Sequence, residues 1–492
     1  MGKEVPRATF TRIDRANYRA KVGQCLDVLA QLLDQRRFAP YSPMTGIELE
    51  LVLVGTDLRP AMCNREILAG IGDPSYQAEL GQFNLELNCA PRLLAGTGLD
   101  QYRDDLLHRL SIVDMHAGKI EARSVMIGTL PTLTPGDAVL RNLSANPRYL
   151  ALNDEIVAAR GEFIALDIRG AERLRAANDS IAPEAACTSV QFHLQVTPED
   201  FARYWNASQA IAGAQLAVGA NAPFLFGRSL WAETRIALFE QATDTRSEQV
   251  KAQGARPRVW FGERWIDSIS DLFAENLRYF PPLLPILTDE DPQAVLAGGG
   301  VPDLPELRLH NGTVYRWNRP VYDVRDGRPH LRVENRVLPA GPTVVDVLAN
   351  AALYYGLVRE LVEQDTPLWT LMPFGQAAAN FHAAARDGIG ATQSWPGLGE
   401  LPAVRLVREH LLPVAAAGLD RLGVAARVRD RLLGVIDGRC AAGHNGDTWQ
   451  RATVRRLERD LGLPRPDALA EMLRRYVDLA AGNEPVHTWP LG

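Results

Sequence analysis

The chain contains 492 residues, of which 46% are hydrophobic and 23% are charged, and its formal net charge is −6. These proportions are typical of a soluble globular protein that buries a large core. No cluster of Lys and Arg stands out in the sequence, whereas the tracking of nucleic-acid phosphates requires a concentrated basic surface. The composition therefore argues against a nucleic-acid-binding protein and favours small-molecule substrates.

The cysteines and the N-terminus indicate the setting in which we expect the protein. The five cysteines are widely spaced and no CxxC pair occurs, which argues against a disulfide framework and a structural zinc site. The N-terminal segment lacks the apolar part of a secretory signal, and no apolar run reaches the ~18 residues of a membrane span. We expect a cytoplasmic protein without a membrane partner. The sequence does not specify the oligomeric state, and a homo-oligomer is compatible with it.

The first third of the chain reads as alternating helices and strands. Apolar residues at helical spacing predict helices, and period-two alternation predicts strands. In chain order we expect a helix at 15–36, strands at 45–54 and 79–89, a helix at 98–117, a strand at 123–128, a helix at 148–160 and an extended segment at 162–168.

The remaining two thirds become progressively more helical. A strand around His193 leads into a helix that we expect to begin at Thr197–Pro198, because Thr is a good N-cap and Pro suits the first helical position. The Pro- and Gly-rich segment 280–306 is either a mobile lid or a simple connector. Beyond Val344 almost everything reads as helix, so we predict a catalytic domain at 1–395 and a helical region at 396–492 packed on it.

Four of the predicted strands carry polar side chains on one face. Side chains alternate between faces along a strand, so Glu48 and Glu50 point the same way, as do Arg332, Glu334 and Arg336. This patterning favours an α+β fold with a mainly antiparallel sheet that is open on one face. The strands concerned are 46–51, 83–88, 190–196 and 331–337.

The polar residues on these strands suggest metal-assisted phosphoryl chemistry. Carboxylates are preferred ligands of Mg²⁺ and Mn²⁺, and such ions bridge the phosphates of ATP. Guanidinium groups bind carboxylate or phosphoryl oxygens in bidentate fashion. The candidates are Glu48, Glu50, Glu86, His193 and Glu334 as ligands, and Arg332, Arg336, Arg235 and Arg246 as clamps.

Each candidate also has an alternative that involves no ligand. The three glutamates on the first two strands could be solvated, and His193 could be a hydrogen-bonded core or surface histidine. Glu334 could form only an ion-pair ladder with its flanking arginines, and Arg235 and Arg246 could be ordinary surface residues. No GxxxxGK[ST] or GxGxxG loop is present, so ATP would have to be held by the metals and the sheet.

Several motifs taken together resemble the glutamate–cysteine ligases and related carboxylate–amine ligases of plants and many bacteria. The segment GIELEL at 46–51 resembles a strand of that family in which both carboxylates bind metal. The segment ANAPF at 220–224 is similar to a characteristic loop, and VENR at 333–336 is similar to a strand that carries a metal-binding Glu and a substrate-binding Arg. The resemblance covers about residues 40–385.

This resemblance implies a fold, a reaction and a set of site residues. The fold would be a curved antiparallel sheet like that of glutamine synthetase, with the active site on its concave face. ATP and Mg²⁺ or Mn²⁺ would activate the γ-carboxylate of glutamate as an acyl phosphate, and an amine, with cysteine as the favoured acceptor, would attack it. The implied metal ligands are Glu48, Glu50, Glu79, Glu86, His193 and Glu334; the implied catalytic residues are Arg336 and Arg235; the implied substrate or ATP contacts are Gln191, Asn221, Arg246, Tyr315, Trp317 and Arg332.

Three alternatives stay open from the sequence. The acceptor could be an amine other than cysteine, and the same carboxylate–His set could activate water in a metal-dependent hydrolase. The chain could also be a catalytically silent protein of the same fold. Tyr315 and Trp317 could line an acceptor pocket or only pack, and His444 and Trp449 could close over the site or form a structural cap.

Overall fold

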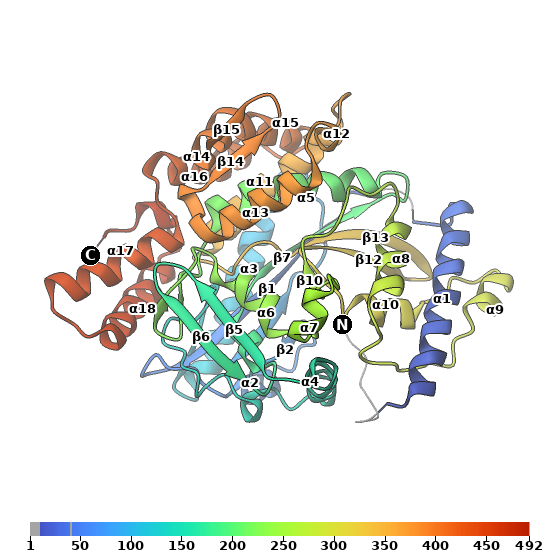
Figure 1. Ribbon diagram of the computed structural model, residues 1–492. Helices are drawn as coiled ribbons and strands as arrows, with labels where there is room; N and C mark the ends of the chain where they lie inside the picture. The colour runs from blue at the N-terminus through green and yellow to red at the C-terminus, as the bar shows by residue number, and fades with distance from the viewer. Residues whose placement is uncertain (1–9, 40–41, 492) are drawn as a thin grey trace.

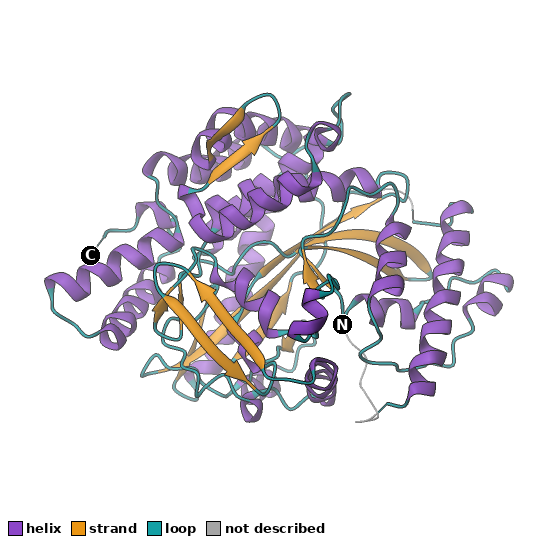
Figure 2. Cartoon of the chain, viewed as in Figure 1, coloured by secondary structure: helices purple, strands orange, loops and turns teal. Residues whose placement is uncertain are grey.

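A seven-stranded antiparallel sheet lies at the centre of the protein (Figure 1). The computed structural model describes residues 10–39 and 42–491. The strand order is β12-β13-β7-β1-β3-β2, and β4 pairs with the far end of β1. The predicted α+β class with a curled antiparallel sheet surrounded by helices is confirmed (Figure 2). The strands are β1 (Thr45–Gly55), β2 (Tyr76–Ala78), β3 (Asn84–Asn88), β4 (Ala122–Val125), β7 (Val190–Val196), β12 (Asn318–Arg325) and β13 (Arg328–Asn335).

The register of these strands brings the polar residues of distant segments next to one another. Glu50 on β1 lies opposite Glu86 on β3, and Glu48 lies opposite Gln191 on β7. On the other side of β7, His193 lies opposite Glu334 of β13. Because side chains opposite each other in a pair share a face, one face of the sheet collects these groups.

The opposite face of the sheet is apolar and buried under two long helices, α5 (Phe201–Gly219) and α11 (Val344–Leu361). Phe192 of β7 is fully buried and its ring packs against the rings of Tyr354 and Tyr355. The Tyr355 hydroxyl donates to the carbonyl of Gly46 at 3.0 Å, and the Trp205 indole N–H donates to the carbonyl of Asn318 at 2.9 Å. These contacts fix the apolar face against the helices and leave the polar face for ligands.

The remaining helices surround this central unit (Figure 2). Helix α13 packs closely on α5, and a side chain at Gly213 of α5 would clash with the backbone of Asn380, which explains the glycine there. The helices are α1 (Arg12–Asp34), α2 (Asn64–Ile71), α3 (Gly98–Gly118), α4 (Pro147–Arg160), α6 (Thr234–Ala242), α7 (Glu248–Ala252), α8 (Ile269–Tyr279), α9 (Pro292–Ala297), α10 (Pro305–Asn311), α12 (Leu368–Leu371), α13 (Phe374–Asp387), α14 (Ala403–Arg405), α15 (Leu412–Arg421), α16 (Ala426–Ala442), α17 (Gly446–Asp460) and α18 (Arg465–Ala481).

Short hairpins complete the fold, and they account for most of the extended residues outside the main sheet. The predicted strand at 162–168 belongs to one of them rather than to the central sheet. They are β5 (Ile164–Arg169) with β6 (Arg173–Asn178), β8 (Phe224–Leu225) with β9 (Arg228–Ser229), and β14 (Thr392–Trp395) with β15 (Gly399–Pro402); β10 (Val259–Trp260) and β11 (Tyr315–Arg316) form a parallel pair.

Two predicted boundaries are wrong in detail. The expected strand at 79–89 is shorter, because the chain reverses between β2 and β3 and leaves Glu79 in the turn. The helix expected from Pro198 is regular only from Phe201. Thr197 nevertheless accepts a hydrogen bond from the backbone N–H of Asp200 at 3.2 Å, so the predicted cap forms one turn ahead of the regular helix.

The segment 280–306 runs from the end of α8 to the start of α10. It contains α9, which lies beside α1 at one edge of the molecule (Figure 1). Lys21 of α1 donates to the carbonyl of Glu290 at 2.5 Å. In this structure the segment is packed between α8 and α10 and against α1, and the choice between a mobile lid and a connector stays a prediction.

The C-terminal part is helical apart from the β14–β15 hairpin, and α15 and α16 pack against α11. Trp449 of α17 is fully buried and packs against Tyr476 and Trp489, which is a structural role. The predicted boundary between 1–395 and 396–492 falls in the turn of the hairpin, and the division into two units stays a prediction. Within the described residues, no helix is both long and apolar enough to cross a bilayer.

Candidate active site

Two cavities open on the polar face of the central sheet. The smaller, about 70 Å³, lies at the end of β1 and β3 near the loop before β7. The larger, about 680 Å³, lies at the start of β1 beside the β12–β13 hairpin. The smaller is lined among others by Glu50, Glu79, Asn84, Glu184, Arg235, Trp317 and Arg336, and the larger by Glu48, Asn88, His193, Asp323, His330 and Arg332.

Three of the predicted ligands form a tight carboxylate cluster at the small cavity. One oxygen from each of Glu50, Glu79 and Glu86 lies within 4.8 Å of the others. Glu50 is 8% exposed and Glu86 is 9% exposed, so water screens their charges poorly. Among the residues that the structure describes, this is the group whose geometry fits a metal ion.

The electrostatics of this cluster favour a bound cation. Burial raises the pKa of Glu50, and burial together with the charge of Glu50 raises the pKa of Glu79 to about 8. Burial also raises the pKa of Glu86 well above its usual range, and Glu48 and Glu79 add to the effect. Like charges at this separation cannot all ionise without compensation. A hard divalent cation with a preference for oxygen ligands supplies that compensation, so the donor set fits Mg²⁺ or Mn²⁺.

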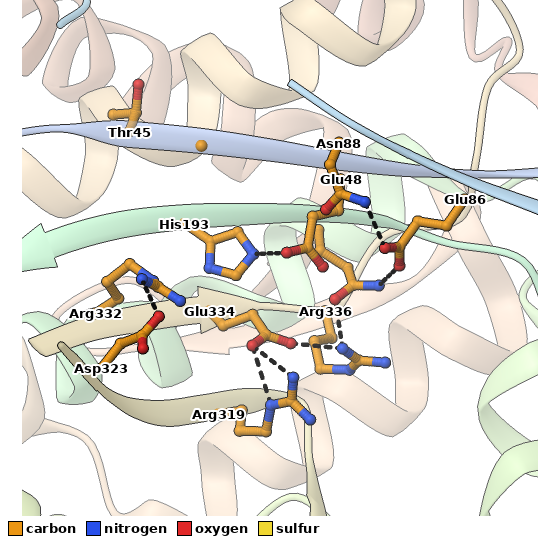
Figure 3. Close-up of polar contacts among 12 residues, drawn as sticks. Thr45, Glu48, Glu86, Asn88, His193, Arg319, Asp323, Arg332, Glu334 and Arg336 are labelled. Carbon is orange, nitrogen blue, oxygen red and sulfur yellow. Dashed lines mark hydrogen bonds and ion pairs between the residues drawn. The ribbon is translucent and has the colours of Figure 1, made fainter. Parts of the chain in front are cut away.

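A second polar group lies beside the first, around His193 (Figure 3). The His193 Nε2 atom lies 3.0 Å from Oε1 of Glu48. The His193 contact lowers the pKa of Glu48 although burial acts in the opposite direction. Glu48 and His193 therefore form a polar pair at the border of the large cavity.

Glu334 is engaged by two arginines (Figure 3). Its Oε2 atom accepts hydrogen bonds from Arg319 Nε at 3.0 Å and Nη2 at 2.8 Å, and its Oε1 atom accepts one from Arg336. These two guanidinium groups hold the pKa of Glu334 well below its usual range despite complete burial. Of the two arginines that flank Glu334 in the sequence, only Arg336 contacts it, because Arg332 pairs with Asp323 at 3.3 Å.

Gln191 connects the two groups. Its side-chain amide donates to Glu50 Oε1 at 2.9 Å, and its oxygen accepts from Arg336. The backbone N–H of Ser189 donates to Glu50 Oε2 at 2.6 Å. Arg336 is therefore fixed between Gln191 and Glu334, next to the carboxylate cluster, where it could neutralise an anionic substrate.

Arg235 of helix α6 lines the small cavity, and buried hydrogen bonds hold its side chain in place. Its Nε donates to Glu233 at 3.0 Å, and its guanidinium lies 5.6 Å from the centre of the Trp317 ring. The other oxygen of Glu233 accepts from the backbone N–H of Asn221 at 3.0 Å. The side chain of Asn221 bonds Ala340, Tyr476 and Gln450 instead of facing a cavity.

The structure therefore brings most, but not all, of the predicted site residues together. Asn221 and Arg246 line neither cavity; Arg246 forms a bidentate ion pair with Asp244, with bonds of 2.8 and 3.0 Å. Arg332 lines the large cavity and Trp317 the small one. Tyr315 lines neither cavity, and the centre of its ring lies 5.1 Å from that of Phe239.

Several residues at the site were not predicted from the sequence. Arg319 lies on the strand that pairs with β13, and only the register shows that it faces Glu334. Glu184 lies in a 3-10 turn (Ala182–Ala186) that carries no strand pattern. His330 alternates with Arg332 on β13 and could have been found by extending the polar face by two residues.

The sequence profile of the glutamate-cysteine ligase family 2 (GCS2) matches residues 44–458. The chain therefore belongs to this family, as the sequence motifs predicted, and it is an ATP-dependent carboxylate–amine ligase.

One solved structure shares the fold of this chain at low sequence identity, and two others give lower similarity. The glutamate–cysteine ligase of Francisella tularensis, crystallised in complex with AMP, is 12% identical, covers 93% of this chain and 91% of its own, and gives a TM-score of 0.57. The bifunctional glutathione synthetase of Pasteurella multocida is 13% identical over 93% of this chain and 55% of its own, with a TM-score of 0.47. The complex of the ubiquitin-like protein Pup and its ligase PafA gives a TM-score of 0.40 at 12% identity over 87% and 71% of the two chains. No curated protein sequence matches the chain.

Proposed function

We propose that the protein joins the γ-carboxylate of glutamate to the amino group of a second substrate, with cysteine as the favoured acceptor, by way of an acyl phosphate. The observation that carries this proposal is the cluster of Glu50, Glu79 and Glu86, with oxygens within 4.8 Å of one another and Arg336 beside them. Family membership and the shared fold support the choice of reaction.

The metal site that we propose uses this cluster first. Glu50, Glu79 and Glu86 would hold Mg²⁺ or Mn²⁺, and the Glu48–His193 pair, which lines the large cavity, would contribute from that side. A metal ion bound there supplies charge neutralisation to the phosphates of ATP. We propose that Glu334 chiefly holds Arg319 and Arg336 in position, because both of its oxygens accept hydrogen bonds from them.

The two cavities divide the substrates by size and charge. The large cavity has space for the nucleotide, and Arg332 and His330 lie on its wall. The small cavity, which contains Arg235, Arg336 and the carboxylate cluster, suits the reacting ends of the two amino substrates. The acyl group would then form beside the central strand β1, which contributes Glu50 to the small cavity and Glu48 to the large one.

In the chemistry that we propose, the residues of the chain orient the substrates and neutralise their negative charges. Arg336, held by Gln191 and Glu334, would bind oxygens of the transferring phosphoryl group or of the γ-carboxylate. Arg235, held by Glu233, would bind a carboxylate of the amino-acid substrate. The γ-phosphoryl group of ATP passes to an oxygen of the γ-carboxylate and ADP leaves. The neutral amine then attacks the acyl carbon, the carbon–nitrogen bond forms, the bond from that carbon to the phosphate oxygen breaks, and the amine nitrogen releases a proton as inorganic phosphate leaves. Preorganised groups of this kind contribute largely through positioning and charge stabilisation.

The test is ADP release by the full chain with ATP and Mg²⁺. Glutamate is supplied alone and with each member of a panel of amines that includes cysteine. We expect ADP release that requires glutamate together with one amine, and a product whose mass equals the two substrates minus one water. The ligase proposal would be rejected if no amine stimulated ADP release, or if no ADP were released with any carboxylate. Either result would favour a hydrolase or a catalytically silent protein of the same fold.

A further inference from the structure

The small cavity is surrounded by polar groups that have no hydrogen-bond partner among the described residues. They are both amide atoms of Asn84, the Oε2 atom of Glu184 and the indole N–H of Trp317. Asn84 and Trp317 are each only 2% exposed, so bulk water does not readily satisfy them. A buried polar group without a partner costs free energy, and several around one cavity indicate that a ligand completes them.

Three separate segments bring these groups together. Asn84 opens β3 and shares its face with Glu86, two residues further on. Glu184 lies in the 3-10 turn at Ala182–Ala186, and Trp317 immediately precedes β12. The two acceptors, Asn84 Oδ1 and Glu184 Oε2, come from two independent chain segments, whereas Asn84 Nδ2 and the Trp317 indole N–H are donors and call for an acceptor on the same ligand.

The charges around the cavity distinguish its two ends. Arg235 and Arg336 are cationic and suit the carboxylate or phosphoryl groups of substrates. Glu184, in contrast, has no Lys, Arg or His of the described residues within ion-pair distance, although it lines the same cavity. A carboxylate in that position attracts a positively charged group with several N–H donors.

We infer that this part of the cavity is an ammonium site, in which Glu184 and the side-chain oxygen of Asn84 accept hydrogen bonds from the ammonium group of an amino substrate. The inference rests on the proposed function only for the identity of that substrate, which is either glutamate or the acceptor amine. Both substrates carry a primary ammonium group, which is the group that the geometry of the cavity predicts. The experiment below distinguishes the ammonium group of glutamate from that of the acceptor amine. Burial, with a further contribution from Glu79, raises the pKa of Glu184, and a bound cation would offset that cost.

The experiment measures binding and so does not depend on turnover. The full chain with Mg²⁺ and ADP is titrated calorimetrically with two matched pairs of probes. Glutamate is compared with glutarate, which lacks its amino group, and cysteine is compared with 3-mercaptopropionate. The wild-type chain should prefer the amino member of at least one pair by about tenfold or more, the effect of a charge-assisted hydrogen bond.

Two variants and one control locate the effect. Glu184→Gln and Asn84→Ala should each weaken binding of that amino probe by about tenfold, and leave the des-amino partner within about twofold. Glu400→Gln, an exposed residue of β15 far along the chain, should change neither. The two site variants remove different partners of one ammonium, so either one that folds suffices.

Each outcome decides the inference. If the site variants lose affinity for glutamate but not for glutarate, the ammonium group of glutamate binds in the site. If they lose affinity for cysteine but not for 3-mercaptopropionate, the ammonium group of the acceptor binds there. Equal affinities within both pairs for the wild type, absence of binding by all four probes, or unchanged affinities in the folded variants would each overturn it. If the binding pattern holds but no amine stimulates ADP release, the proposed function fails while the ammonium site stands.

Discussion

The two faces of the central sheet are built from the same strands but satisfy their side chains in opposite ways. On the apolar face, Phe192 and Leu49 are fully buried, and the ring of Phe192 packs against Tyr354 and Tyr355 of α11. On the polar face, Glu50 and Glu86 are almost as buried, yet their neighbours are other carboxylates. Burial alone therefore does not distinguish a core from a site.

What differs is whether the protein itself completes the interactions. The apolar face is stabilised by burial and close packing within the protein, and it requires no ligand to complete its contacts. The polar face has carboxylates whose pKa values are raised by burial and mutual repulsion, together with polar groups that lack partners. Native proteins keep such unfavourable arrangements chiefly at functional sites, where a ligand completes them. The following predictions separate the two faces experimentally.

The largest effect is expected from Glu50→Gln, which should reduce ligase turnover by about 10³-fold, or about 4 kcal/mol of transition-state stabilisation. The substitution removes one carboxylate of the cluster but leaves an oxygen that can accept from Ser189. Stability should be unchanged or higher, because a repelling charge is removed. Turnover and urea unfolding are measured together, with Glu400→Gln as the control; a fully active variant would reject the metal assignment.

The apolar face should show the reverse pattern. Phe192→Ala creates a cavity against Tyr354 and Tyr355 and should lower the free energy of unfolding by about 3–5 kcal/mol. Any protein that remains folded should keep its affinity for Mg²⁺. The matched control is Phe163→Ala, where the side chain is 68% exposed and the change should stay within about 0.5 kcal/mol. A wild-type unfolding midpoint for Phe192→Ala would contradict this account of the core.

The pH dependence of stability should reveal the strained cluster. The pKa of Glu79 rises from 4.5 to about 8 on folding, so between these values the folded state holds a proton that the unfolded chain releases. The free energy of unfolding should therefore fall as the pH rises from about 5 to 8. Saturating Mg²⁺, which favours the ionised cluster, should flatten this slope and raise stability at pH 8, by about 2.7 kcal/mol at a hundredfold excess over its Kd.

Urea unfolding at several pH values, with and without Mg²⁺, measures this effect. Glu79→Gln should reduce the slope even without metal, because one of the carboxyl groups with a raised pKa is gone, while Glu86 and Glu184 keep theirs. If stability without metal does not fall over this range, or if Glu79→Gln leaves the slope as it was, the predicted repulsion within the cluster is wrong.

The smallest effect concerns Asn221, which the sequence assigned to substrate binding. Its side chain bonds Ala340, Tyr476 and Gln450 inside the protein, so Asn221→Ala should cost about 1–3 kcal/mol of stability. KM values for ATP, glutamate and the amine should change by less than about twofold. A selective rise in one KM without loss of stability would restore the assignment to substrate contact.

Much of the fold and of the site was predictable because it depends on local alternation. Period two on a strand is enough to place Glu48 and Glu50 on one face and to predict an antiparallel sheet with a polar side. The order of short motifs pointed to the family that the sequence profile identifies. These signals lie within a few residues of one another, where the sequence directly dictates geometry.

The tertiary structure alone decided which of these residues meet and how their charges are balanced. The register of β12 against β13 placed Arg319 on Glu334, and the turn before β3 brought Glu79 to Glu50. The loop before β7 placed Glu184 at the small cavity, whereas Asn221 was turned into the core behind Arg235. Such contacts join residues that are far apart in the sequence. They are set by strand register and packing, which are properties of the whole folded chain. The sequence by itself therefore determined the type of chemistry, and the folded chain determined which carboxylates remain uncompensated and available for a ligand.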